Sequence, residues 1–317
     1  FKPILKKVIW GGSDICPFKG ITPVENGVGE SWELSHVEGN YSIVDNGELE
    51  GKSLDELIRS YGKELLGKKV MERFGTTFPL LIKFIDARDN LSIQVHPDDE
   101  LAKKRHNSFG KTEMWYVIKA EKGAGLYSGF SEQIDAEEYV KRVENNTIMD
   151  VLQRYDVNEG DVFFLPAGRV HAIGAGCFIA EIQQNSNTTY RVFDYGRLGA
   201  DGKPRALHVE KALDVARLCP PERPAGPMGK PEQNGDCTST LLAKCGYFTA
   251  RLLDVAGSAP LCADGESFHS LLCLSGSGAV ICGGGAVPFA KGDSLFLPAG
   301  LGAYTIAGRA QLVLTTL

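Results

Sequence analysis

Residues 160–168 read GDVFFLPAG and return almost unchanged at residues 292–300 as GDSLFLPAG. The two copies differ only at their third and fourth positions. Each copy has the pattern of a Gly-Asp turn, a short apolar strand and a tight Pro-Ala-Gly turn. A unit of this kind in each half of a chain predicts two related halves, each built as a jelly roll of antiparallel strands.

Short apolar runs rich in β-branched and aromatic residues surround the first copy and predict strands. They are FPLLIKFID (78–86), LSIQVH (91–96), EMWYVIKA (113–120), DVFFLPA (161–167), VHAIGAG (170–176) and CFIAEIQ (177–183). Helical patterns are fewer: SLDELIRSYGKELL behind a capping box of Ser53 and Glu56, EEYVKRV after Asp135, IMDVLQRY after Thr147, and LHVEKALDVARL (207–218). Strands and helices do not alternate, which disfavours a doubly wound parallel sheet.

The segment PPERPAGPMGKPEQNG (220–235) is the clearest linker candidate, because Pro and Gly dominate it. Beyond it Gly, Ala, Ser and Cys become more frequent and the acidic helical patterns stop. We therefore expect an N-terminal domain over residues 1–229, which carries the helical insertions, and a C-terminal domain over residues 230–317. The echo of AEKGAGLYSG (120–129) in LSGSGAVICG (274–283) fits this division.

Composition excludes several classes of protein. With 43% hydrophobic and 23% charged residues, the 317-residue chain has the make-up of a globular protein. No apolar run approaches the ~18 residues that span a bilayer. A net charge of −6 without a basic cluster argues against nucleic-acid binding.

The eight cysteines contain no CxxC pair, so we expect buried free thiols in a reducing cytoplasm. The chain opens at Phe1, from which we expect a clipped start without a signal peptide.

Four polar residues in the first half have the pattern of a metal site. Gln94 and His96 alternate on one predicted strand, so their side chains lie on the same face. Glu113 begins the next strand, and His171 follows the Pro-Ala-Gly turn. Two histidines and a carboxylate form the ligand set of catalytic Zn²⁺, with Gln94 as a possible fourth ligand, and also that of Fe(II) in oxygenases. In the alternative interpretation His96 is a turn residue beside Pro97 and His171 a core histidine.

The second half lacks these ligands. Counting from the repeated motif, Ala303 stands where the first half has His171. Aligning Gly278 with Gly123 places Phe268 opposite Glu113. One active half and one metal-free half are therefore expected, with one metal ion per chain.

Further motifs make the resemblance specific: Trp10-Gly11-Gly12, GESWE (29–33), LSIQVHPD (91–98), GKTEM (110–114) and the stretch 171–191. Together they resemble type I mannose-6-phosphate isomerase (phosphomannose isomerase), most closely its short bacterial form. The resemblance implies two cupin-type barrels, a cytoplasmic enzyme and a Zn²⁺ ion. It also implies interconversion of mannose 6-phosphate and fructose 6-phosphate through an enediol. The residues implied are zinc ligands Gln94, His96, Glu113 and His171, catalytic Arg191, and substrate contacts Lys83, Ser92 and Lys111.

An aldose–ketose isomerisation also needs a group that shuttles a proton, and Glu181 or Lys111 could serve. Each candidate has a structural alternative. Lys83 and Glu181 interrupt apolar strands, so each is either paired or directed into a cavity. Lys111, in a Gly-rich turn, would be read as a surface residue without the resemblance. Around Arg191, the nearby Asp194 and Arg197 could equally form structural ion pairs.

Two other functions remain open from the residues alone. An Fe(II)-dependent cupin oxygenase would use the same two histidines and Glu113, although the neutral Gln94 and the lysines argue against it. A non-catalytic bicupin that only binds a sugar phosphate would have lost a ligand or Arg191, and neither is lost.

Overall fold

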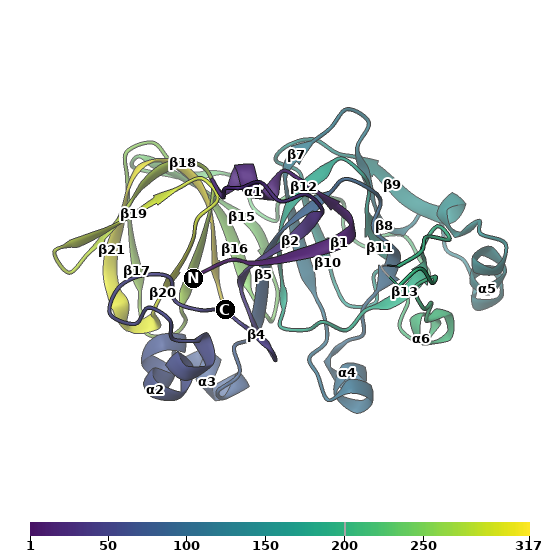
Figure 1. The fold of residues 1–317 in the computed structure, drawn as a ribbon, viewed down its shortest axis with the longest axis horizontal. Coiled ribbons are helices and arrows are strands. Elements are labelled where there is room, and N and C mark those ends of the chain that lie inside the picture. Colours follow the sequence, from purple (N-terminus) through teal and green to yellow (C-terminus); the bar gives the residue numbers. More distant parts are fainter. Residues whose placement is uncertain (200) are drawn as a thin grey trace.

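The computed structural model describes residues 1–199 and 201–317 (Figure 1). The protein is mainly β, as predicted, and every strand pairing between its named strands is antiparallel. The strands form sheets of six, five, eight and two strands. In Figure 1 the N-terminal sheets occupy the right of the view and the C-terminal sheet, in yellow and green, the left.

Two sheets build the N-terminal half. The six-stranded sheet has the order β1-β2-β5-β12-β7-β10, with bounds β1 Ile4–Gly12, β2 Val28–Leu34, β5 Leu80–Ala87, β12 Cys177–Gln184, β7 Glu113–Ala120 and β10 Val162–Leu165. The five-stranded sheet has the order β13-β6-β11-β8-β9, with bounds β13 Tyr190–Phe193, β6 Ile93–Val95, β11 His171–Ile173, β8 Gly125–Phe130 and β9 Leu152–Asp156. Buried side chains from both sheets, Trp115, Leu126 and Ile173 among them, form one core cluster between them.

The eight-stranded sheet builds the C-terminal half. Its main order is β14-β15-β16-β21-β18-β19, with β17 on β21 and β20 on β18. The bounds are β14 Glu232–Asn234, β15 Cys237–Lys244, β16 Thr249–Val255, β17 Ser258–Ala263, β18 His269–Cys282, β19 Gly285–Ala290, β20 Ser294–Leu297 and β21 Gly302–Thr316. The two-stranded sheet pairs β3 His36–Val37 with β4 Asn40–Tyr41.

The helices are short. They are α1 Ile15–Phe18, α2 Leu54–Leu66, α3 Lys68–Phe74, α4 Asp99–His106, α5 Ala136–Glu144 and α6 Val209–Leu213, with 3₁₀ turns η1 Ile148–Val151 and η2 Ala299–Leu301. The predicted capping box is confirmed: Ser53 accepts from the Glu56 N–H, and the Glu56 side chain accepts from the Ser53 N–H. Asp135 caps α5 as predicted.

Two helix predictions are wrong. Thr147 makes no side-chain cap bond, and the chain after it forms η1 and then β9, because β9 gains main-chain partners on β8. Residues 207–218 are helical only over α6. Beyond α6, the Arg217 N–H donates to the Gly168 carbonyl at 2.8 Å instead of to a carbonyl of the helix. This bond holds the chain against the turn between β10 and β11. Helix α4 was not predicted, although Asp98 caps it and its last turn is basic.

The two copies of the repeated motif make the same turn. Gly160 and Gly292 both take left-handed backbone, with φ of 90° and 89°. The Asp161 carboxylate accepts from the Asn158 N–H at 2.8 Å, and the carboxylate of the matching aspartate in the second copy accepts from the Ala290 N–H at 2.8 Å. The sequence repeat is therefore a repeat of local structure.

Strand register corrects one alignment. Leu165 of β10 lies opposite Glu113, and the matching Leu297 of β20 lies opposite His269. His269, not Phe268, therefore occupies the position of Glu113 in the second half. The glycine alignment was one residue out because Gly278 lies within β18, which has a register shift between Cys273 and Ser275, whereas Gly123 lies in the turn between β7 and β8. Phe268 is instead fully buried in the core.

The two halves share a core. Phe84 and Ile182, on the outer face of the six-stranded sheet, lie in one buried cluster with Phe248, Leu272 and Val313 of the C-terminal sheet. Helices α2 and α3 lie against the C-terminal half (Figure 1), and the Phe268 N–H donates to the last carbonyl of α2.

The Pro/Gly segment expected to be a linker is hydrogen-bonded to both halves. The Gly226 N–H donates to the carbonyl of Val162 in the N-terminal half, at 2.8 Å. The Met228 N–H donates to the carbonyl of Leu242 in the C-terminal half, at 3.1 Å. This segment therefore has a fixed path between the two sheets.

All eight cysteines are free thiols, as expected, and four of them are buried: Cys16, Cys177, Cys237 and Cys273. Cys262 is exposed, contrary to the expectation of general burial. Among the described residues, no helix has the length and apolarity needed to cross a membrane.

Candidate active site

Three predicted ligands meet between the two N-terminal sheets. The ligand atoms of His96, Glu113 and His171 all lie within 4.8 Å of one another, and all three residues are buried. The Glu113 carboxylate lies 3.0 Å from Nε2 of His171 and 3.8 Å from Nε2 of His96. His171 begins β11 and His96 directly follows β6 of the same sheet, and β7 presents Glu113 from the other.

Main-chain carbonyls orient both imidazole rings. Nδ1 of His96 lies 2.9 Å from the Thr188 carbonyl, and Nδ1 of His171 lies 2.7 Å from the Arg169 carbonyl. A ring that donates from Nδ1 keeps its Nε2 lone pair free, which is the arrangement found in metal-binding histidines. Both Nε2 atoms point towards Glu113.

One ligand atom of this group has no hydrogen bond. Nε2 of His96 is buried without one, whereas the Glu113 carboxylate has only its contacts with His171 and Lys111. Burial, followed by the charge of Lys111, holds the pKa of His96 well below its usual value. Burial raises the pKa of Glu113, but Lys111 and His171 outweigh it and hold the pKa well below its usual value. A neutral His96 imidazole beside a carboxylate suits a divalent metal ion.

Gln94 lies beside this group. It lies opposite His171 in the β6–β11 register, and its amide is 3.4 Å from Nε2 of that ring. Because the two ends of a glutamine amide exchange by a simple rotation, this side chain can present its oxygen to the same point.

Lys111 is buried beside the ligands. Its ammonium lies 3.0 Å from Glu113, and 6% of the residue is exposed. The Lys111 N–H donates to the Pro97 carbonyl at 3.0 Å, which fixes the turn between α4 and β7. The interpretation of Lys111 as a surface residue is therefore wrong, because the Gly-rich turn folds inward.

Lys83 and Glu181 are paired. They lie opposite each other in the β5–β12 register, with Lys83 Nζ 3.0 Å from Glu181 and 3.6 Å from Glu30. Burial alone would lower the pKa of Lys83, but the Glu181 and Glu30 carboxylates outweigh it and raise the pKa. The Trp115 indole donates to Glu181 at 2.8 Å. Of the two interpretations offered for these residues, the paired one holds.

Trp115 is a site residue that the sequence reasoning missed. Its ring lies edge-on to the His171 ring at 5.3 Å, so it contacts both the ligand group and the Lys83–Glu181 pair. The signal was available, because Trp115 stands two residues after Glu113 on one strand and therefore shares its face. Glu30, on β2, carried no such signal.

Arg191 lies opposite Gln94 in the β13–β6 register. One guanidinium nitrogen donates to the Ala206 carbonyl at 2.9 Å, while the buried Nε has no partner. Burial, followed by the charge of Arg205, lowers the pKa of Arg191. Asp194 instead pairs with Arg197 at 2.7 Å and with Arg205, so these neighbours are structural.

Ser92 is buried just before β6. It is thus on the strand segment that carries Gln94, and all the predicted site residues belong to the two N-terminal sheets or to the turns between their strands.

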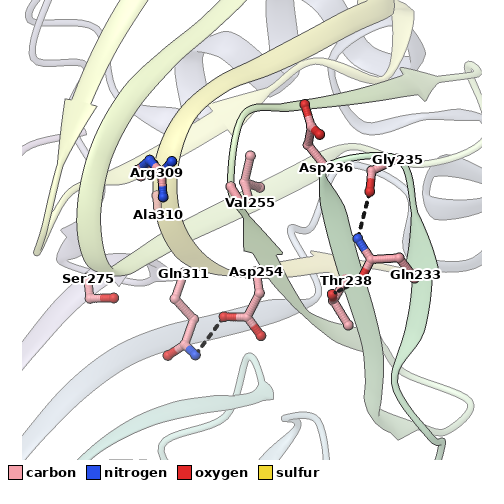
Figure 2. Close-up of a pocket in the computed structure, with 11 residues that line it drawn as sticks. Gln233, Gly235, Asp236, Thr238, Asp254, Val255, Ser275, Arg309, Ala310 and Gln311 are labelled. Atoms are coloured by element: carbon pink, nitrogen blue, oxygen red, sulfur yellow. Dashed lines mark hydrogen bonds between the residues drawn. The ribbon is translucent and has the colours of Figure 1, made fainter.

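A separate hollow of about 560 Å³ lies in the C-terminal half (Figure 2). In it the Gln311 amide donates to Asp254 at 2.9 Å and accepts from the Tyr116 hydroxyl of β7 at 3.2 Å. Arg309 lies above this pair in the figure. None of the predicted site residues lines this hollow.

Two family models match the chain. The phosphomannose isomerase type I catalytic domain matches residues 1–123, and the mannose-6-phosphate isomerase cupin domain matches residues 238–317. The chain is 38% identical to mannose-6-phosphate isomerase ManA of Bacillus subtilis over 318 residues, covering 100% of this chain and 98% of the relative. The chain belongs to the type I phosphomannose isomerase family. The predicted resemblance and the cupin-family fold are thus confirmed.

Other members of the phosphomannose isomerase family agree in length and fold. Mannose-6-phosphate isomerase of Streptococcus mutans is 34% identical, with 98% of this chain and 95% of the relative covered. The solved structure of mannose 6-phosphate isomerase from Bacillus subtilis matches with a TM-score of 0.91 at 33% identity, covering 100% and 98% of the two chains. A phosphomannose isomerase structure from Salmonella typhimurium, at 17% identity and a TM-score of 0.79, shares the fold.

Proposed function

We propose that this chain is an enzyme that interconverts mannose 6-phosphate and fructose 6-phosphate. The observation that carries the proposal is the buried group of His96, Glu113 and His171 with Lys111 against it, in a chain that aligns end to end with named mannose-6-phosphate isomerases. The partner is a small sugar phosphate, with neither nucleic acid nor membrane involved, and the compartment is the cytoplasm. Free thiols throughout the chain support a reducing compartment.

One Zn²⁺ ion per chain is the cofactor of this proposal. His96, Glu113 and His171 would hold it, with the Gln94 amide oxygen as the fourth ligand. Support comes from Nε2 of His96, which is buried without a hydrogen bond and which a cation would satisfy. When bound, such an ion acts as a Lewis acid on an oxygen of the substrate.

The reaction moves one proton between neighbouring carbons. The proton leaves carbon 2, beside the aldehyde, and returns to carbon 1, while a hydroxyl proton passes from oxygen 2 to oxygen 1. The intermediate is an enediol, and negative charge builds on an oxygen before it forms. Arg191 would stabilise that charge, and its position opposite Gln94 in the β13–β6 register supports this role.

Lys111 and Glu181 are the candidates for moving the proton. The Lys111 ammonium contacts Glu113 of the ligand group. Glu181 does not touch that group directly but accepts a hydrogen bond from Trp115, whose ring contacts His171. Lys83, Ser92 and Lys111 are the substrate contacts of the proposal. Lys83 pairs with the carboxylates of Glu30 and Glu181. Besides contacting the substrate, it would therefore hold Glu181 in position.

Two cupin-type barrels complete the proposal. The six- and five-stranded sheets form the catalytic barrel of an N-terminal domain, residues 1–229, with the helices as insertions. The eight-stranded sheet forms a second barrel in a C-terminal domain, residues 230–317, without a metal site. The identical turns before β10 and β20 support this duplication.

The test is Glu113→Gln. Because Glu113 contributes the only carboxylate of the ligand group, this change should weaken metal binding and nearly abolish turnover of mannose 6-phosphate, with the circular-dichroism spectrum unchanged. Bound metal and coupled fructose 6-phosphate production are the readouts, with and without chelator. Glu232→Gln, an exposed carboxylate on β14, is the matched control. A Glu113→Gln variant that stays fully active after chelation contradicts the zinc site. Oxygen uptake with Fe(II) would indicate an oxygenase instead.

A further inference from the structure

A cavity of about 310 Å³ opens on the seam between the two N-terminal sheets. Tyr155 of β9, the edge of the five-stranded sheet, and Phe163 of β10, the edge of the six-stranded sheet, meet there edge to face at 5.3 Å. Residues 221–226 of the Pro/Gly segment form the outer wall. The cavity is therefore enclosed by both sheets and by the segment that joins the two halves.

Positive charge dominates the lining. Four cations, Arg169, Arg217, Arg223 and Lys244, face one carboxylate, Glu222. Arg217 pairs with Glu222 at 3.1 Å, which leaves an excess of positive charge in a chain whose formal charge is −6. A cavity with this charge attracts small anions.

Arg169 is the decisive residue. It is 6% exposed, yet among the described residues no side-chain hydrogen bond or ion pair involves its guanidinium. Its Cδ lies 3.2 Å from where a Cβ on Gly129 would stand, and Pro221 lies 3.1 Å from the same point, so the arginine stem is packed in place. Its guanidinium adjoins the cavity without a protein partner, so a bound anion would form charge-assisted hydrogen bonds with it.

We propose that this cavity binds a small phosphate-bearing anion at a site distinct from the metal centre. Guanidinium groups match phosphate oxygens two at a time, and two arginines with a lysine suit a dianion better than a single carboxylate. The aromatic pair and the proline wall would contact the remainder of such a molecule.

The cavity is connected to the metal centre through the main chain. The Arg169 carbonyl accepts the Nδ1 hydrogen of His171, and Ser128, which lines the cavity, lies opposite His171 in the β8–β11 register. An anion that holds the Arg169 side chain therefore also steadies the residue that orients a proposed metal ligand. Phosphate binding should accordingly change the turnover rate of the wild type at saturating substrate.

Calorimetric titration of the metal-loaded full chain with inorganic phosphate, at constant ionic strength, tests the site. The titration contains saturating mannose 6-phosphate so that the metal centre is occupied. We expect one saturable phosphate per chain, and a loss of affinity of at least tenfold in Arg169→Gln. Arg217→Gln, on the more exposed wall, should also weaken binding and serves if Arg169→Gln fails to fold. Arg59→Gln, exposed on α2, is the control that should bind like the wild type.

Three results would overturn the proposal: no saturable phosphate binding by the wild type, unchanged affinity in both cavity variants, or loss of phosphate binding whenever mannose 6-phosphate is present. The last result would make the cavity part of the substrate site. Because the titration measures the heat of phosphate binding, once the added mannose 6-phosphate has come to equilibrium, and not product formation, a failure here is distinguishable from a failure of the proposed isomerase activity.

Discussion

At the candidate metal centre, the orientation of each histidine ring depends on a single main-chain carbonyl. Thr188 and Arg169 each accept from one imidazole, and neither contributes a side chain to the ligand group. Any substitution that keeps the backbone path at these positions should leave the rings in place. The site is therefore more tolerant of changes in side chain than its burial suggests, except at the ligands themselves.

Arg191 should act on the developing enediolate. A group that acts only in the transition state lowers kcat and kcat/KM together. Arg191→Ala should therefore reduce kcat by roughly 10²–10³ with KM nearly unchanged, the scale for loss of one preorganised donor. Lys83→Ala and Ser92→Ala are the comparison, and should act at least partly through KM if these residues contact the phosphate. Steady-state kinetics of the three variants distinguish these roles. An Arg191→Ala variant with unchanged kcat and raised KM would show that Arg191 contacts the phosphate instead.

For single residues, the sequence predicts which side chains share a strand face but misses contacts between strands far apart in the chain. Alternation was enough to bring together Gln94 and His96. The pairing of Lys83 with Glu30 depends on the β2–β5 contact, which joins segments far apart in the chain. No local pattern records such a contact, so Glu30 could not be predicted.

Among the elements, β3 connects α2 to the six-stranded sheet through His36. Its Nδ1 accepts from the Phe78 N–H at 3.3 Å, and its Nε2 lies 3.2 Å from Asp55 of α2. This arrangement uses the neutral ring, because a proton on Nδ1 would displace the Phe78 donor.

His36 should make stability fall in mild acid. Burial lowers its pKa in the folded protein, although Asp55 opposes the shift. The unfolded chain therefore binds the proton more readily, and the stabilisation is present above the unfolded pKa of about 6.5 and lost as the pH falls below it. The loss is at most about 1.4 kcal/mol per pH unit for one proton. Urea unfolding at pH 7, 6 and 5.5 should show a shallower decline for His36→Gln. Equal slopes would contradict the assignment.

Helices were predicted correctly where a capping residue and a helical pattern of apolar residues both occurred. α2 and α5 had both a capping residue and an apolar face. Residues 148–155 had a helical period, but β8 offered main-chain partners to β9, and sheet pairing overrode the local pattern. The same competition shortened α6, whose continuation bonds to the Gly168 carbonyl.

For the whole molecule, a repeated turn in both halves with a metal-binding group in only one of them predicts one metal ion per chain. Within residues 1–199 and 201–317, only His96, Glu113 and His171 form a group of metal-binding geometry. The matching positions of the second half hold Cys262 for Gln94, His269 for Glu113 and Ala303 for His171. Elemental analysis should therefore return about one ion, lost in His171→Ala. Two ions of similar affinity would contradict a metal-free second half.

A buried ion pair lies at the junction of the two halves. Lys19, just after α1, lies 2.8 Å from Glu33 of β2, with 7% and 1% of the two side chains exposed. Ser31 donates to the same carboxylate at 2.6 Å, and the Lys19 ammonium also donates to the Gly292 carbonyl. Gly292 belongs to the second copy of the repeated turn, so this lysine joins the N-terminal half to the repeat in the C-terminal half.

Lys19→Met should therefore destabilise both halves together. It leaves Glu33 buried without its cation, and burial already raises the pKa of that carboxyl even with Lys19 present. Removing one partner of a buried pair costs about 3–5 kcal/mol, whereas removing both charges costs much less. Lys19→Met combined with Glu33→Gln should accordingly recover much of the loss. Urea unfolding followed by fluorescence and by circular dichroism should give one coincident transition in each variant, because the halves share a core. A single variant within about 0.5 kcal/mol of the wild type would show that the pair does not stabilise the junction.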